Sequence, residues 1–188
     1  MKNQTGTPSS EKILLAATRI AQAHGYSGLN VRTLADEVGI KAASLYHHFP
    51  SKADLAAAVA RRYWEDSQAT LDAIAAETPD PLACLRAYPQ TFRRSLENDN
   101  RICLCSFMTA ESDDLPDAVK AEVQRFADVN IDWLEKVLSA AGIKDSKTRA
   151  RAIFAAVSGA QLMARGRADI ALFDDLIANY QAAGLMPA

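Results

Sequence analysis

The side chains with the clearest chemistry in this sequence lie together in its first third. Lys41 can reach a guanine edge or a phosphate, and Ser44 can donate or accept a hydrogen bond at a base edge. Tyr46 and His47 can donate to phosphate oxygens, which fixes the register of a protein on a duplex without reading its sequence. Side chains of these types at this spacing favour contact with DNA over a chemical reaction.

Five neighbouring residues extend this candidate DNA-contact set. Ala42 and Ala43 are small enough to allow close approach to a groove, where their methyl groups can meet thymine methyls. Lys52 stands in the first turn of an expected helix, where its charge adds to free backbone N–H groups and favours a phosphate. Arg32 and Thr33 stand at the start of an earlier helix and are candidates for the same role.

Two short helices separated by a glycine must position these side chains. Apolar residues at helical spacing predict a helix over residues 31–38, with Asn30 as its N-cap and Gly39 at its end. A second helix is expected over about residues 42–48, before Pro50. The pair forms a helix-turn-helix, in which the first helix crosses the DNA backbone and the second lies in the major groove.

The amino-acid sequence of residues 29–55 identifies a protein family more specifically than a helix-turn-helix pattern alone does. It contains Leu45-Tyr46-x-His48-Phe49-x-Ser51-Lys52-x-x-Leu55. This run resembles the signature of the tetracycline-repressor (TetR) family, and the close resemblance covers about residues 10–60. It implies an all-α protein in which a three-helix helix-turn-helix DNA-binding domain is joined by a long helix to a C-terminal helical domain for ligand binding and dimerisation.

The two adjacent histidines raise the alternative of a metal site. Neighbouring residues on a helix point about 100° apart, and the chain holds three histidines in all. A DNA-facing His47 and a packed His48 are therefore favoured, and neither a metal nor another cofactor is expected. A second alternative is that the helix pair is a packed hairpin inside some other α-protein.

The charge distribution favours DNA binding over that second alternative. The net charge of all 188 residues is −2. Residues 1–62 hold eight basic and four acidic groups, a charge of +4, whereas the remaining 126 residues hold 13 basic and 19 acidic groups, a charge of −6. A basic segment on an acidic remainder is expected where a protein meets phosphates.

The rest of the chain also has helical periodicity, and no strand is expected. Pro89 is expected to kink or split its helix, and Ser146 to cap the helix that follows it. The domains expected are a flexible tail over residues 1–8, the helix-turn-helix domain over 9–56 and the second domain over 57–188. The helices expected outside the helix-turn-helix cover about residues 10–24, 52–76, 82–96, 101–110, 116–141, 147–165 and 170–182.

A dimer is expected because one helix-turn-helix makes few contacts and two-fold dimers meet paired half-sites. The resemblance implies that the last two helices form a four-helix bundle with their symmetry mates. Small residues on the first of these helices allow close approach, and the second carries an apolar stripe. The interface residues expected are Ala152, Ala156, Gly159, Ala160, Met163, Phe173, Leu176, Ile177 and Tyr180.

The middle helices are expected to hold a pocket for a small-molecule effector, as the resemblance implies. Bulky apolar residues line such pockets, although they also fill cores. Cys103 stands near a helix start and near Arg101, and both features lower the pKa of a thiol. Buried, inert cysteines are nevertheless the favoured interpretation. The pocket residues expected are Phe92, Cys103, Phe107, Met108, Phe126, Trp133 and Phe154.

Several classes of function are not expected. No run approaches the roughly 18 apolar residues of a membrane span, no signal peptide is recognised, and three cysteines are few, so a cytoplasmic protein is expected. No nucleotide-binding, zinc-protease or hydrolase motif is present, so an enzyme is not expected. The function expected is a repressor that binds a palindromic operator as a homodimer and is released by an effector. The alternative is a thiol-based redox or electrophile sensor acting through Cys103.

Overall fold

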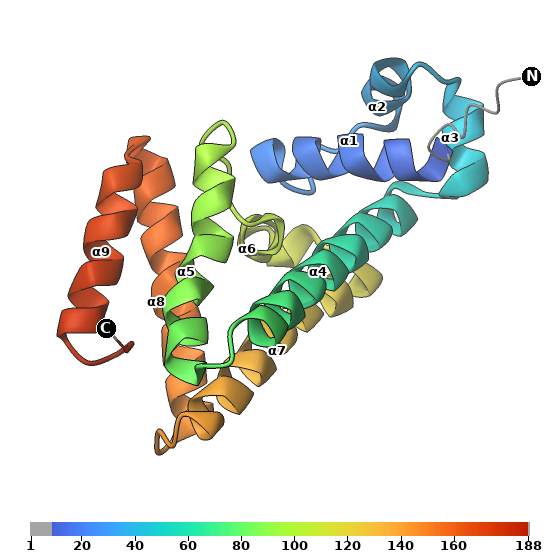
Figure 1. Ribbon diagram of the computed structural model, residues 1–188. Helices are drawn as coiled ribbons and strands as arrows, with labels where there is room; N and C mark the ends of the chain where they lie inside the picture. The colour runs from blue at the N-terminus through green and yellow to red at the C-terminus, as the bar shows by residue number, and fades with distance from the viewer. Residues whose placement is uncertain (1–8, 188) are drawn as a thin grey trace, which may run out of the picture.

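The computed structural model describes residues 9–187, which form nine α-helices, one short 3-10 turn and no strand (Figure 1). The all-α expectation is therefore confirmed, whereas the expected flexible tail over residues 1–8 lies outside the described residues. The helices are α1 (Ser9–His24), α2 (Val31–Val38), α3 (Ala42–His48), α4 (Lys52–Glu77), α5 (Pro81–Glu97), α6 (Leu104–Ala110), α7 (Asp117–Ala140), α8 (Ser146–Arg167) and α9 (Ile170–Ala182), and the 3-10 turn is Ser112–Asp114.

Local signals explain the bounds of α2 and α3. The side chain of Asn30 accepts hydrogen bonds from the backbone N–H groups of Arg32 and Thr33, at 2.9 and 3.1 Å. Gly39 ends α2 in the left-handed region, at φ +75°, where a residue without a Cβ is favoured. Because Leu34 and Leu45 are fully buried, the two helices are fixed to each other and to α1.

The long helix α4 connects the two ends of the molecule. Ser51 caps it by accepting from the backbone N–H of Asp54 at 3.1 Å. Its first turns pack against α1 through Leu55, Ala56 and Val59, and the rest of the helix runs beside α7 (Figure 1). Helix α4 is therefore in contact with both α1 and α7.

The second half of the chain packs around α7 and a group of aromatic rings. Tyr88 of α5 stacks on Trp133 of α7, with ring centroids 5.8 Å apart, and donates from its hydroxyl to Asn130 at 3.1 Å. Phe92 contacts both Tyr88 and Phe126. Helices α8 and α9 lie side by side at the edge of the molecule away from α2 and α3 (Figure 1).

Three local details differ from the expectations. Pro89 does not split α5, which is continuous from Pro81 to Glu97 and has buried residues on both sides of the proline. Ser146 is not an N-cap but lies inside α8, and its hydroxyl is 3.0 Å from that of Ser139. Helix α6 begins at Leu104 rather than at Arg101, so Cys103 precedes the helix.

Candidate functional site

The face of α3 away from the core is open to solvent. Leu45 is the one fully buried residue of this helix and anchors it, and Ala42 is half-buried. Lys41 precedes the helix as its N-cap residue, and its side chain makes no capping hydrogen bond. The residues of the expected DNA-contact set that the structure leaves exposed are Arg32, Thr33, Lys41, Ala43, Ser44, Tyr46 and His47.

The expectation of a packed His48 is wrong, because this side chain is exposed like that of His47. The two imidazole centroids lie 5.8 Å apart, and the ring of Phe49 lies 6.4 Å from that of His48. Both histidines line a hollow on α3 together with Ala43 and Ser44. Among residues 9–187, no group of three His, Cys, Asp or Glu side chains is placed to hold a metal ion.

Lys52 has a contact within the chain that its sequence position did not indicate. Its Nζ donates to the carbonyl oxygen of Ser27 at 3.3 Å and lies 4.4 Å from the centroid of the Tyr26 ring. The ammonium group therefore holds the turn between α1 and α2 against the start of α4. A substitution of Lys52 changes this turn as well as any contact with phosphate.

Two residues that sequence reasoning missed hold the same turn from the other side. The carboxylate of Glu111, at the end of α6, accepts from the backbone N–H groups of Tyr26 and Ser27 at 2.5 and 3.0 Å. Arg165 of α8 donates to the carbonyl oxygens of Gln22 and Ala23 at 3.0 and 3.3 Å. We call these contacts the turn clamp. They link α6 and α8 directly to the end of α1.

The backbone of Gly25 fits inside the turn clamp because it has no side chain. Its φ is +67°, and a Cβ at this position would lie 2.2 Å from Oε2 of Glu111 and 2.8 Å from the ring of Phe107. Phe107 itself lies beneath the guanidinium of Arg165, at 5.0 Å. Phe107 therefore belongs to the clamp, and it lines neither of the two clefts described below. The glycine was the one signal of this contact in the sequence.

A cleft of about 280 Å³ brings together three of the seven expected pocket residues: Phe92, Cys103 and Phe126. We call it the Phe92 cleft. Phe154 packs behind it, with its ring 6.2 Å from those of Phe92 and Phe126, and Met108 is fully buried in the core. The other residues that line the cleft are Thr18, Gln22, Tyr63, Asp66, Ser67, Thr70, Thr91, Arg94 and Ser95.

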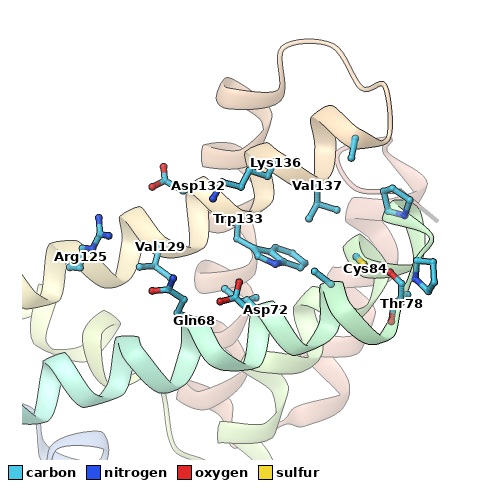
Figure 2. Close-up of a pocket in the computed structure, with 15 residues that line it drawn as sticks. Gln68, Asp72, Thr78, Cys84, Arg125, Val129, Asp132, Trp133, Lys136 and Val137 are labelled. Carbon is cyan, nitrogen blue, oxygen red and sulfur yellow. Dashed lines mark hydrogen bonds between the residues drawn. The ribbon is translucent and has the colours of Figure 1, made fainter.

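Trp133 lies apart from these residues and lines a different cleft, between α4 and α7 (Figure 2). The two clefts share no lining residue. Tyr88, which stacks on Trp133 and contacts the ring of Phe92, lies between the two clefts. The expected pocket residues are therefore divided between two sites.

The structure agrees with the favoured interpretation of Cys103 as a buried, inert thiol, and not with a lowered thiol pKa. Cys103 is 2% exposed, and this burial raises the pKa of the thiol, because the thiolate loses its solvation. Hydrogen bonds with Ser106 and Tyr63 oppose the rise and do not cancel it. Arg101, which was expected to favour the thiolate, pairs with Asp99 at 3.5 Å. The thiol is therefore protonated at neutral pH.

Gln161 is a further residue that sequence reasoning missed. It is fully buried in α8, where its Oε1 accepts from the backbone N–H of Cys103 at 3.0 Å. Its Nε2 donates to the carbonyl oxygen of Phe92 at 2.6 Å. One side chain of α8 therefore joins the two segments that form a wall of the Phe92 cleft.

The expected interface residues fall into two groups. Ala160, Phe173 and Ile177 are buried within the chain and pack in its own core, so they are not available to a second copy. The other six are exposed or half-buried: Ala152, Ala156, Gly159, Met163, Leu176 and Tyr180. Leu162, which was not expected, is 61% exposed beside Met163. The accessible part of this surface is therefore mainly on α8.

No helix in the described part of the chain combines the length and apolar character that crossing a membrane requires.

Comparisons with known proteins give a consistent result. Residues 13–59 match the family described as bacterial regulatory proteins, tetR family. The HTH-type transcriptional regulator LmrA of Bacillus subtilis is 50% identical over 42 residues, and the match spans 22% of each protein.

Two solved structures resemble almost the whole chain. A TetR transcriptional regulator from Legionella pneumophila superimposes with a TM-score of 0.90 at 24% identity, over 96% of this chain and 99% of that one. A TetR-family transcriptional regulator from Agrobacterium tumefaciens superimposes with a TM-score of 0.84 at 30% identity, over 89% and 93% of the two chains.

Proposed function

The chain belongs to the TetR family of bacterial regulatory proteins, and we propose that it is a ligand-responsive repressor that binds a palindromic operator as a homodimer. The observation that carries the proposal is the exposed face of α3, which presents Lys41, Ser44, Tyr46 and His47 around the buried anchor Leu45. Residues 9–56 would form the DNA-binding domain and residues 57–188 the effector and dimer domain.

The contacts with DNA divide into two kinds. Small side chains at Ala43 and Ser44 let α3 approach the floor of the major groove, where Ser44 meets base edges. Tyr46 and His47, together with Arg32 of α2, contact phosphates and fix the orientation of the helix. The protein acts in the cytoplasm, on the chromosome.

The dimer is built on the accessible surface of α8. Leu162 and Met163 are large apolar side chains that solvent reaches in the single chain, at 61% and 44% exposure. Near them Gly159 and Gly166 have open space around the position of a Cβ, so the backbone of another helix can come close. A two-fold axis at this surface places the two α3 helices on separate half-sites.

The effector binds in the Phe92 cleft and acts on α4. Tyr63, Ser67 and Thr70 of α4 line this cleft one helical turn apart, so an occupant contacts the helix that leads to α1 and α3. The cleft also touches α1 through Thr18 and Gln22. Occupation of the cleft favours a position of α4 in which the distance between the α3 helices of the two protomers no longer matches the distance between the operator half-sites.

Selection of bound DNA from a random pool, with the full-length protein, tests the proposal. The expected product is an inverted repeat whose half-sites are about one helical turn apart or a multiple of it. Lys41→Ala should weaken binding and reduce the salt slope by about one phosphate contact. Lys41 is a cleaner test than Lys52, because Lys52 also holds the turn between α1 and α2. Enrichment of no sequence, or affinity indifferent to salt, would contradict the proposal.

A screen of small molecules for release of the selected operator tests the effector step. Thr70→Phe fills the Phe92 cleft from α4 and should abolish the response to any releasing compound while operator binding persists. Release that persists in this variant would place the effector elsewhere. The thiol-sensing alternative is not favoured, because Cys103 is buried and its thiol pKa is raised.

A further inference from the structure

The cleft that contains Trp133 has a volume of about 420 Å³, which is large enough for a small organic molecule (Figure 2). We call it the Trp133 cleft. It lies between the C-terminal halves of α4 and α7, beside the loop that joins α4 to α5. Its apolar wall consists of Leu71, Ala75, Pro79, Pro81, Cys84, Val129, Trp133, Val137 and Ala140.

The indole of Trp133 is held rigidly and carries an unused donor. The ring is 7% exposed and stacks on Tyr88, with centroids 5.8 Å apart and planes 21° apart. Its Nε1 has no hydrogen-bond partner among residues 9–187. The second tryptophan differs, because Nε1 of Trp64 donates to the carboxylate of Glu122 at 2.8 Å. A covered donor without an acceptor is unfavourable, and an acceptor supplied by a ligand removes that penalty.

The charges at the rim of the cleft cancel. Asp72 and Asp132 are acidic, Arg125 and Lys136 are basic, and none of the four forms an ion pair within the described part of the chain. Figure 2 shows Asp72 of α4 beside the indole ring. The rim therefore favours neither an anion nor a cation, while the carboxylate next to the ring can accept a hydrogen bond.

We propose that the Trp133 cleft binds a neutral, planar aromatic compound that carries a hydroxyl group. The ring lies against the apolar wall, the hydroxyl oxygen accepts from Nε1 of Trp133, and the hydroxyl hydrogen is donated to Asp72. Nε1 has almost no accessible surface in the free protein, so neighbouring side chains shift to admit the oxygen while Asp72 stays within reach of the hydroxyl group. This site is separate from the effector cleft proposed above.

Calorimetric titration of the full-length protein with 1-naphthol, in the absence of DNA, tests the chemistry of the site. We expect saturable binding of one molecule per chain. The anion 1-naphthoate should bind at least tenfold more weakly, because its carboxylate has no hydrogen to donate to Asp72 and would lie against a second carboxylate. Trp133→Phe keeps the stacked ring and removes the donor, and should weaken 1-naphthol roughly tenfold. The control Trp64→Phe should leave the affinity unchanged. Equal affinity of 1-naphthol for the wild type and Trp133→Phe overturns the proposal.

A pair of filling substitutions tests the location. Ala75 and Thr70 lie on the same helix, and each lines a different cleft. Ala75→Phe fills the Trp133 cleft and should abolish the heat of 1-naphthol binding, whereas Thr70→Phe should leave it intact. The reverse pattern places the compound in the Phe92 cleft and overturns the proposal. Because no operator is present, failure here is distinct from failure of the repressor proposal.

Discussion

The two ends of α4 meet regions that are built differently. At its start, the helix-turn-helix is held by small and aliphatic residues, and its functional side chains stand on an exposed surface. At its other end, α5 and α7 enclose large aromatic rings, and the side chains that bind a ligand are part of the core itself. We infer that contact with DNA can be changed at little cost in stability, whereas the clefts cannot be changed so freely.

The largest effect is expected from Phe92→Ala. The ring is 3% exposed and contacts three other rings, so its removal should lower the free energy of unfolding by about 3–5 kcal/mol. Denaturant titration measures the loss. The corresponding change in the helix-turn-helix, His47→Ala, removes an exposed ring and should change the free energy of unfolding by less than about 0.5 kcal/mol. Similar losses of unfolding free energy in both variants would contradict the difference between the helix-turn-helix surface and the aromatic core.

A smaller effect is expected where the two regions touch, at the turn clamp. Gly25→Ala should cost about 2 kcal/mol or more, because it adds left-handed strain and a clash with Glu111. Gly142→Ala is the control, since its φ of +71° is similar and no atom lies within 4 Å of the added Cβ. The difference between the two unfolding free energies measures the clash alone. If the two variants lose equal stability, the clamp is not rigid.

Asn30→Ala should lower the free energy of unfolding by about 1 kcal/mol, because two backbone donors at the start of α2 lose their acceptor. Asn30→Asp keeps an acceptor oxygen and should restore most of the stability. The melting temperatures of the wild type, Asn30→Ala and Asn30→Asp measure these differences. An unchanged melting temperature in Asn30→Ala would show that tertiary contacts, not the cap, define this helix.

The smallest effect is expected from Glu122→Gln, between α4 and α7. Burial alone would raise the pKa of Glu122, but hydrogen bonds from Arg61 and Trp64 outweigh it and hold the pKa below its ordinary value of 4.5. The wild type should therefore exceed the variant in stability above about pH 4.5, by about 1 kcal/mol or less, since Arg61 is largely exposed. The difference should fade as the pH drops through the lowered pKa. A constant difference at all pH values would exclude the carboxylate as its source.

The same contrast explains what could be predicted from the sequence. The bounds of α2 and α3 were predicted correctly because Asn30 and Gly39 act on residues one or two turns away. The exposure of His48 was predicted wrongly, because it depends on where the short helix meets the core. For Cys103 the sequence favoured the buried thiol but left two interpretations open, because its burial is set by residues far along the chain, such as Gln161.

The turn clamp could not be predicted for the same reason. Glu111 lies 85 residues from Tyr26, and Arg165 lies 143 residues from Gln22. The grouping of pocket residues was likewise only partly foreseen, because bulky apolar residues on neighbouring helices can face either side of α4. Residue types indicate which side chains favour a cleft, and the packing of helices decides which cleft they line.

The buried side chain of Gln161 also makes one amide informative about motion. The N–H of Cys103 lies just before α6, and its partner is the carboxamide of α8 at 3.0 Å. Its protection from hydrogen exchange therefore depends on the junction of α5, α6 and α8 staying closed, not on the helix being folded. Exchange at this single amide, compared with that at the hydrogen-bonded amides of α6 from Phe107 onward, separates brief opening of the cleft wall from unfolding of the helix.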